Sequence, residues 1–306
     1  VGGIPGMTKL VGVAPDADLL MATDTQGGSE YFMTDWCVTE GARVVLHEYA
    51  PWVGYHLDGS SDMEGLIDET SAQGVSHINP AGNLSTAKKL AKLTIPSGET
   101  TEVPIVVPDG YGIQVMGVTF LWRDTSRDLE FELVSPDGEA SAVFSQSASG
   151  ANTDFGDEYV LGNQRLDSSR GTAMTLGYLY QTDGAGPIPT GDYTLRITDP
   201  GSAGDDDVEL VMYVLDEVSG WGLGAHFPEH VSEDHLVGYP GTADHGMGIA
   251  AYVGRGEEEY WGEPGERAGY SGRGHRIDGE RALWISGPAD PWTAGHFDQF
   301  PVSYIL

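Results

Sequence analysis

The apolar positions of the first ninety residues follow two different spacings. Residues 42–46 are a short, mostly apolar run, which is typical of a strand buried in a parallel sheet, and residues 75–78 are the next predicted strand. Residues 28–40 and 61–71 carry apolar side chains three and four positions apart, as a helix requires. Strands and helices that alternate in this way predict an α/β domain over residues 1–90.

Both predicted helices carry start signals. Ser61 and Glu64 have the spacing of a capping box, in which the serine and glutamate side chains satisfy free backbone N–H groups at the helix start. Ser29 is the expected N-cap of the first helix, and Phe32, Trp36 and Cys37 are expected on its apolar face. These signals place two helices between the predicted strands.

From about residue 91 the pattern changes to alternation of polar and apolar residues, which indicates strands with one wet face. Turn sequences such as Ser135-Pro-Asp-Gly138 separate the strands, and no helix is expected. We therefore expect an antiparallel β-sandwich, a jelly roll, over residues 91–235. Its predicted strands are 93–95, 102–107, 113–122, 129–134, 193–198 and 208–215.

Residues 236–306 return to the α/β pattern of residues 1–90, with a strand predicted at 248–253 and loops rich in glycine and arginine. The predicted fold class is therefore α/β, a parallel sheet with helices, interrupted by an all-β insert at 91–235. A domain inserted at a surface loop is tolerated when the two ends of the guest lie close together.

Charge and cysteine content narrow the function. The 306 residues include 15 Lys+Arg against 47 Asp+Glu, for a net charge of −32. Such a chain repels nucleic acid and anionic membranes, and we expect it in a secreted or cell-envelope location. Cys37 is the single cysteine, which excludes an internal disulfide and any zinc site built on two cysteines. No apolar run reaches the 18 or so residues that span a bilayer.

Three segments, in order, resemble the subtilisin-like serine protease family: residues 12–19, 41–83 and 238–279. The second contains Ala81-Gly82-Asn83, and the third is similar to the family's run towards its catalytic serine. The resemblance covers about half of the chain. Its layout is similar to that of the clostridial germination proteases, which carry a jelly roll within a subtilase domain.

The resemblance implies acyl transfer through a serine nucleophile, but it places the catalytic Asp, His and Ser outside these residues. The family's His block would end just before Val1-Gly2-Gly3, and its Ser block would begin just after residues 300–306. Ser303 lacks the setting that such a nucleophile needs. The chain is therefore expected to be the core fragment of a serine endopeptidase, cut from something longer and inactive alone.

Asn83 matches the side-chain amide donor of the family's oxyanion hole. The plain alternative is a loop asparagine that satisfies local backbone groups. Ahead of it, Asn79 and Pro80 stand where relatives have small residues lining the substrate pocket before Ala81 and Gly82. Pro80 also removes a backbone N–H.

Glu48, Tyr49 and Ala50 stand where relatives usually have Ser-Leu-Gly, whose backbone pairs with the substrate as an added strand. Glu48 puts an acid where a neutral residue is usual. Two hypotheses follow. One is altered specificity for peptides or proteins with basic or small side chains; the other is a pseudoprotease or protein-binding module that works through the cleft or the insert.

The sequence contains two groups of possible metal ligands, and neither has the spacing of a known metal site. His226, His230 and His235 have metal-ligand chemistry, but Pro228 interrupts the helix that would bring the first two together. The run at residues 205–207 is three aspartates, which can bind calcium, although an exposed turn is favoured. We expect no cofactor other than a structural calcium. A carbohydrate-binding β module is a third hypothesis, which the α/β flanks oppose.

Overall fold

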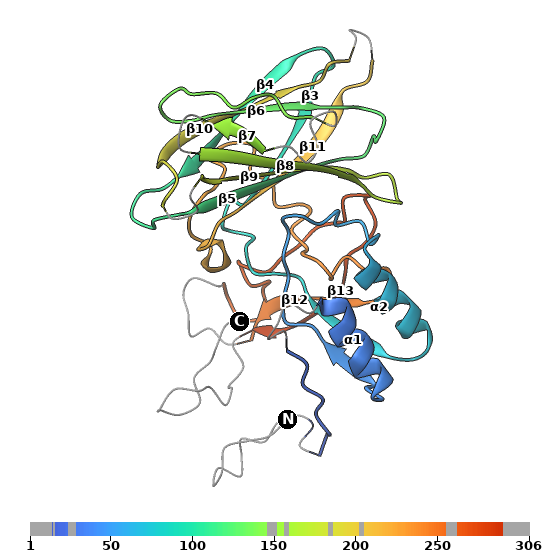
Figure 1. Cartoon of the computed structure of the whole chain (residues 1–306). Coiled ribbons are helices and arrows are strands. Elements are labelled where there is room, and N and C mark those ends of the chain that lie inside the picture. Colours follow the sequence, from blue (N-terminus) through green and yellow to red (C-terminus); the bar gives the residue numbers. More distant parts are fainter. Residues whose placement is uncertain are drawn as a thin grey trace.

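The computed structural model describes residues 14, 16–23, 29–145, 152–155, 159–182, 186–201, 205–254 and 262–289. Its regular elements form two groups (Figure 1). One group is a parallel sheet with two α-helices, and the other consists of two antiparallel sheets. The predicted segments at residues 1–3 and 300–306, Ser303 included, lie outside the described residues.

The parallel sheet has the order β1-β2-β12-β13. Its strands come from both ends of the chain. Strand β2 pairs with β12, and all nine antiparallel strands lie between these two in the sequence. The bounds are Val44–Leu46 for β1, Ser76–Pro80 for β2, Met247–Val253 for β12 and Leu283–Ala289 for β13.

Helix α2 (Asp62–Ala72) begins as the sequence predicts. The hydroxyl of Ser61 accepts from the backbone N–H of Glu64, and the Glu64 carboxylate accepts from the backbone N–H of Ser61, so the capping box is confirmed. Leu66 and Ile67 of this helix are buried in the protein core.

Helix α1 (Glu30–Thr39) also forms where predicted, but its expected apolar face is wrong at two of three positions. Cys37 is buried as expected, whereas Phe32 is 69% exposed and Trp36 is 44% exposed, and the helix buries Thr34 instead. The side chain of Ser29, the N-cap residue, forms no capping hydrogen bond.

The antiparallel strands form a three-stranded sheet, β4-β10-β6, and a six-stranded sheet, β3-β11-β5-β9-β8-β7. Apolar side chains of the two sheets share one core, in which the ring centroids of Phe120 of β5 and Phe131 of β6 lie 4.1 Å apart. A 3₁₀ turn, Ser219–Trp221, follows the last strand. The bounds are Leu90–Ile95 (β3), Thr100–Val107 (β4), Val115–Trp122 (β5), Glu130–Val134 (β6), Asn152–Phe155 (β7), Tyr159–Asp167 (β8), Ala173–Gln181 (β9), Gly191–Thr198 (β10) and Val208–Leu215 (β11).

The predicted fold class, an α/β protein with a subtilisin-like parallel sheet and helices around an all-β insert, is wrong. Strands make up 35% of the structure and helices 10%, and the described part of the chain has two α-helices. Nine of its strands are antiparallel, and long segments such as 262–282 run as turns and loops, since several glycines and Pro264 oppose a helix there. The protein is mostly β.

A second core joins the two groups of elements. It contains Leu66 and Ile67 of α2 together with Leu121, Met174 and Val211 of the six-stranded sheet. In the described residues, neither α-helix is long and apolar enough to cross a membrane.

Buried charges reinforce this junction. Asp244 accepts a bidentate pair of hydrogen bonds from Arg170 (2.8 and 2.9 Å) and contacts Arg276, which is buried. Asp58, fully buried nearby, accepts from the hydroxyls of Ser168 and Thr172, both at 2.6 Å. Loops from distant parts of the sequence are thereby fixed together.

Candidate functional site

The segments after β1 and β2 meet, as the carboxyl ends of neighbouring parallel strands do. The backbone N–H of His47 donates to the carbonyl of Ile78 (2.9 Å), and that of Ala81 donates to Ile249 (3.0 Å). A Cβ atom added at Gly82 would lie 3.6 Å from Cβ of Ala50. The structure therefore brings the residues predicted at 48–50 next to those predicted at 81–83.

The backbone around Asn83 is held on both sides. The carbonyl of Ala81 accepts from the N–H of Gly238 (3.2 Å), and the carbonyl of Gly82 accepts from the N–H of Gly272 (2.8 Å). A Cβ at Gly272 would lie 2.1 Å from the Ala81 oxygen, so only glycine permits this approach. Two loops thus clamp the turn that carries Asn83.

The side chain of Asn83 itself is exposed. Within the described residues, no hydrogen bond engages its amide, either from local backbone or from another side chain. A fixed backbone with an unengaged amide leaves both N–H groups of Asn83 available to a ligand.

The segment opposite Asn83 has unpaired backbone groups, and Gly238 packs against the carbonyl of Ala50. Glu48 is exposed, and Tyr49 and Ala50 are half-buried. In the part of the chain that the structure describes, no backbone hydrogen bond joins residues 48–50 to another strand. Free N–H and C=O groups of this kind can pair with an added extended peptide.

The side chains of Asn79 and Pro80 point to opposite faces of strand β2. Asn79 is fully buried, donates weakly to the carbonyl of Pro240 (3.4 Å), and lies beside Ile67 of α2. Its Oδ1 has no hydrogen-bond partner among the described residues. Pro80, on the other face of β2, is half-buried. Asn79 therefore faces the interior under the cleft rather than its surface.

Sequence reasoning missed a buried histidine pair under the same strands. Nε2 of His47 lies 3.2 Å from Nδ1 of His77, and Nε2 of His77 lies 2.7 Å from Oγ1 of Thr70. Burial lowers the pKa of His47 to about 4, helped by His77, and burial also lowers the pKa of His77. Both rings are neutral near pH 7, so they support the strands without adding charge.

An aromatic cluster also lies beside the segment 48–50, again unpredicted. The rings of Tyr55 and Tyr239 stack at 4.1 Å, and Tyr49 lies 6.1 Å from Tyr239. Burial raises the pKa of all three phenols, so they are uncharged at neutral pH. They form a largely apolar wall next to exposed Glu48.

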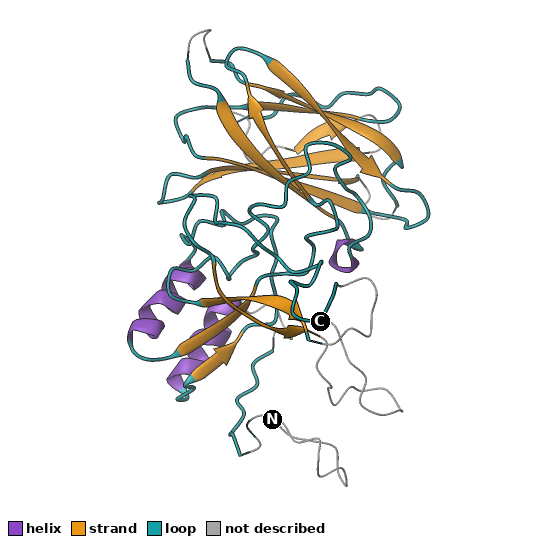
Figure 2. Ribbon diagram, turned by 180° about the vertical axis from the view of Figure 1, so that it is seen from behind, coloured by secondary structure: helices purple, strands orange, loops and turns teal. Residues whose placement is uncertain are grey.

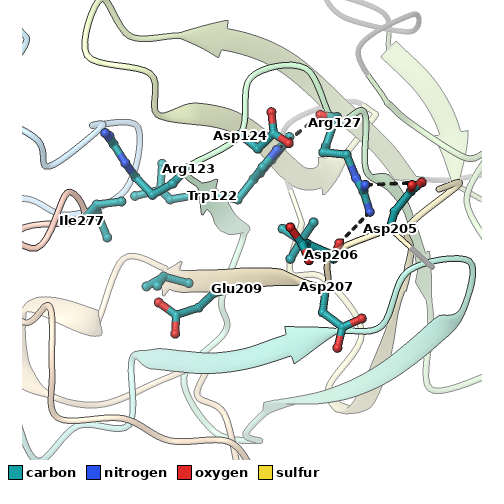
Figure 3. A pocket seen from close by; sticks show the side chains of 12 residues that line it. Trp122, Arg123, Asp124, Arg127, Asp205, Asp206, Asp207, Glu209 and Ile277 are labelled. Carbon is teal, nitrogen blue, oxygen red and sulfur yellow. Dashed lines mark hydrogen bonds and ion pairs between the residues drawn. The ribbon is translucent and has the colours of Figure 1, made fainter. Parts of the chain in front are cut away.

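A cavity of about 690 Å³ lies elsewhere, at the junction of β5 and β11, and shares no lining residue with the cleft (Figure 3). Arg127 spans its rim, 3.7 Å from a carboxylate oxygen of Asp205 and bonded to the backbone carbonyl of Asp206 (3.1 Å). Asp207 accepts from the N–H of Ser97 (3.1 Å). Arginine and backbone groups thus engage this acidic run.

The predicted metal candidates do not converge. The described residues contain no group of three or more His, Cys, Asp or Glu side chains placed to hold a metal ion. Nδ1 of His226 lies 3.1 Å from the carbonyl of Gly224, whereas Nδ1 of His235 contacts the carbonyls of His275 and Arg276.

No family model matches this chain, and no curated protein matches it. Among solved structures it is similar to the Clostridium perfringens CspB protease, with a TM-score of 0.67 and 15% sequence identity. The match covers 89% of this chain and 53% of that chain, so this chain spans about half the length of its neighbour. At this identity the likeness shows the fold, and the chain therefore has a protease-like fold.

Proposed function

We propose that these residues form the substrate cleft of a subtilisin-like serine endopeptidase, with Asn83 as a side-chain donor of its oxyanion hole. One observation carries the proposal. Asn83 holds an exposed, unengaged amide on a clamped turn, directly beside a segment with open backbone groups. The protease-like fold supports it.

In this mechanism the described residues contribute a hydrogen-bond donor held in a fixed position. When a serine attacks a peptide carbonyl, negative charge develops on the carbonyl oxygen, and a fixed N–H donor stabilises that charge more than it stabilises the substrate. Removal of one such donor costs about 10²–10³ in kcat. The clamps from Gly238 and Gly272 fix the turn, so little reorganisation is needed as the charge develops. The nucleophile and its base would come from polypeptide outside these residues.

The substrate is a peptide or protein bound in extended form. The backbone of residues 48–50 supplies pairing groups, and the tyrosine wall at Tyr49, Tyr55 and Tyr239 supplies apolar contact. The exposed carboxylate of Glu48 favours basic side chains in the peptide at this position. Buried Asn79 contributes by packing under the cleft.

The second candidate is a pseudoprotease or protein-binding module with the same cleft. The departures at Glu48 and Pro80 favour it, because both change positions that relatives use for substrate. In that case the cleft binds a peptide without turnover. The retained amide at Asn83 opposes this candidate, because a fixed N–H donor contributes most where negative charge develops on a substrate oxygen, and we therefore place catalysis first.

We extend the proposal to the organisation and setting of the chain. Residues 1–90 and 236–306 would belong to one unit, and residues 91–235 would be a jelly roll inserted into it. A net charge of −32 favours a secreted or cell-envelope location and disfavours nucleic-acid partners.

The test uses the longest native polypeptide that contains residues 1–306. A fluorophosphonate probe should label a serine outside residues 1–306, and fluorogenic peptides with basic side chains should be cleaved. Labelling and turnover must be seen together. A polypeptide that binds such peptides but is neither labelled nor active supports the second candidate, and one that neither binds nor cleaves peptides contradicts both.

A further inference from the structure

Two buried histidines lie directly beneath the segment 48–50 of the proposed cleft. His47 is the residue before Glu48, His77 belongs to β2, and the rings of both are buried. The rings stack with their centroids 5.5 Å apart, and Nε2 of His47 lies 3.2 Å from Nδ1 of His77. Two titratable groups are thus enclosed next to the backbone that would pair with substrate.

Helix α2 packs against this histidine pair. Both α-helices lie on one side of the parallel sheet (Figure 2), and Oγ1 of Thr70 in α2 lies 2.7 Å from Nε2 of His77. The Thr70 hydroxyl donates to the carbonyl of Leu66 (2.7 Å), so it accepts from Nε2–H of His77. Nδ1 of His77 is therefore free to accept from Nε2–H of His47, and this pattern requires two neutral rings.

The segment above the pair has few other restraints. Across the part of the chain that the structure describes, no backbone hydrogen bond holds Glu48, Tyr49 or Ala50, and the buried hydroxyl of Tyr49 has no partner. The ring of Tyr49 stands edge-on to the ring of His47, with the centroids 5.9 Å apart. The position of Tyr49 therefore depends on packing, and His47 is part of that packing.

The surroundings of the pair oppose a positive charge. His47 faces the rings of His77 and Tyr49, and burial together with His77 lowers the pKa of His47 to about 4. Burial also lowers the pKa of His77, although Asp68 of α2, which lies 3.4 Å from Nδ1 of His245, opposes this shift. Among the described residues, no carboxylate contacts either ring of the pair. A proton added in acid thus creates a buried charge without an ion-pair partner.

We propose that the His47–His77 pair is an acid-sensitive switch that sets the position of the segment 48–50 and thereby controls peptide binding in the cleft. A proton on Nδ1 of His77 sets two N–H donors against each other, and a proton on His47 leaves a buried cation. Either charge is relieved when the His47 side chain turns toward solvent. Because Glu48 and Tyr49 follow His47 in the chain and Tyr49 packs on its ring, both move with it.

The effect on peptide binding rests on the proposed function, whereas the movement of Tyr49 rests on the pair alone. With a pKa of about 4, half of the His47 rings are protonated at pH 4. A peptide that binds the neutral form alone then has an apparent Kd about twofold higher at pH 4 than at pH 7, and protonation of His77 adds to this.

Fluorine NMR tests the movement without any substrate. We would place 4-trifluoromethylphenylalanine in place of Tyr49, whose hydroxyl makes no hydrogen bond among the described residues, and, as the control, in place of Tyr111, exposed between β4 and β5. In the longest native polypeptide that contains residues 1–306, the signal from position 49 should shift reversibly between pH 7 and pH 4, and the signal from position 111 should stay fixed. The double variant His47→Gln/His77→Gln has no titratable ring in the pair and should lose the shift.

Binding of a fluorescent peptide with basic side chains gives the second readout. Its Kd should rise at least twofold from pH 7 to pH 4 in the wild type and less in the double variant. A shift at position 49 in a polypeptide that binds no peptide at either pH would support the movement of the segment and contradict the proposed function.

Three results would overturn the switch. The first is a fixed signal from position 49 while the ring protons of His47 and His77 titrate. The second is an equal shift in the double variant, or in His47→Gln alone where the double variant does not fold. The third is a shift that appears only together with loss of the far-UV circular dichroism signal, which would assign it to global unfolding.

Discussion

Nε2 of His47 lies 3.2 Å from Nδ1 of His77 beneath the candidate cleft. The hydroxyl of Thr70 donates to the carbonyl of Leu66 at 2.7 Å, so it accepts from Nε2–H of His77. Nδ1 of His77 is then the acceptor for His47. A proton added to Nδ1 of His77 would make it a second donor facing Nε2–H of His47 and would break this chain of hydrogen bonds.

Stability should therefore fall as the pH is lowered from about 6.5 to about 4. His47 has a pKa of about 4 in the folded chain against 6.5 ordinarily, so the unfolded chain binds the proton first. The stabilising contribution is complete above pH 6.5 and corresponds to roughly 3 kcal/mol for His47. His77 shifts in the same direction, although Asp68 partly opposes its shift.

Urea unfolding between pH 7.5 and 4.5 measures this effect. His47→Gln should flatten the pH dependence, whereas the control Thr94→Gln, at an exposed residue without a titratable side chain, should leave the slope unchanged. Equal slopes in the wild type and His47→Gln would contradict the assignment.

The two helix starts give a matched comparison. Ser61→Ala removes a side-chain bond to the N–H of Glu64 and should cost about 1 kcal/mol of unfolding free energy. Ser29→Ala should lower the free energy of unfolding by only about 0.3 kcal/mol, because the Ser29 side chain makes no capping hydrogen bond. Chemical denaturation of both variants checks the difference, and equal losses would be the contrary result.

The buried charges at the junction should matter more than charges on the surface. Asp244→Asn leaves buried Arg276 and its neighbour Arg170 short of a carboxylate, and should cost roughly 1–3 kcal/mol, because Asp244 is itself partly exposed. Glu102→Gln, which breaks the exposed pair with Arg196 (3.0 Å), should cost less than about 1 kcal/mol. Thermal unfolding in low and high salt distinguishes the two, and a smaller loss at Asp244 would refute this ranking.

Backbone approach at the cleft predicts a strong glycine effect. A Cβ at Gly238 would lie 2.4 Å from the carbonyl oxygen of Ala50, so Gly238→Ala should destabilise by roughly 1–3 kcal/mol and displace the segment 48–50. Gly65→Ala, inside α2 with no atom within 4 Å of the new methyl, should stabilise by roughly 0.5–1 kcal/mol. The two substitutions are expected to change the free energy of unfolding in opposite directions. A Gly238→Ala variant as stable as the wild type would contradict this prediction, because it would show that the loop moves to accommodate the methyl group.

Local signals predicted local structure well. The Ser61 and Glu64 pair marked the start of α2, and alternation located β4, β6, β10 and β11 within a few residues. Strand β9 was missed because it is buried almost throughout and lacks alternation, and β13 because it contains Gly287 and Pro288. Such strands are recognised only through their neighbours.

Properties set by distant residues could not be predicted. The apolar run at Val44–Leu46 was expected to be buried, but its strand lies at the sheet edge and two of its three side chains are exposed. The contact of His47 with His77 depends on the register of two strands thirty residues apart. The fold class was wrong because strands that the sequence pattern did not reveal, such as β8 and β9, raise the strand content to 35% against 10% helix.

The most direct test of the proposed function is the kcat of the Asn83→Ala variant in the longest native polypeptide that contains this chain. Thr86→Ala, exposed on the same turn region, is the control. We predict a fall of about 10²–10³ in kcat for Asn83→Ala with little change in KM or stability, and no fall for the control. An active polypeptide in which Asn83→Ala leaves kcat unchanged would contradict the assignment of Asn83 to the oxyanion hole.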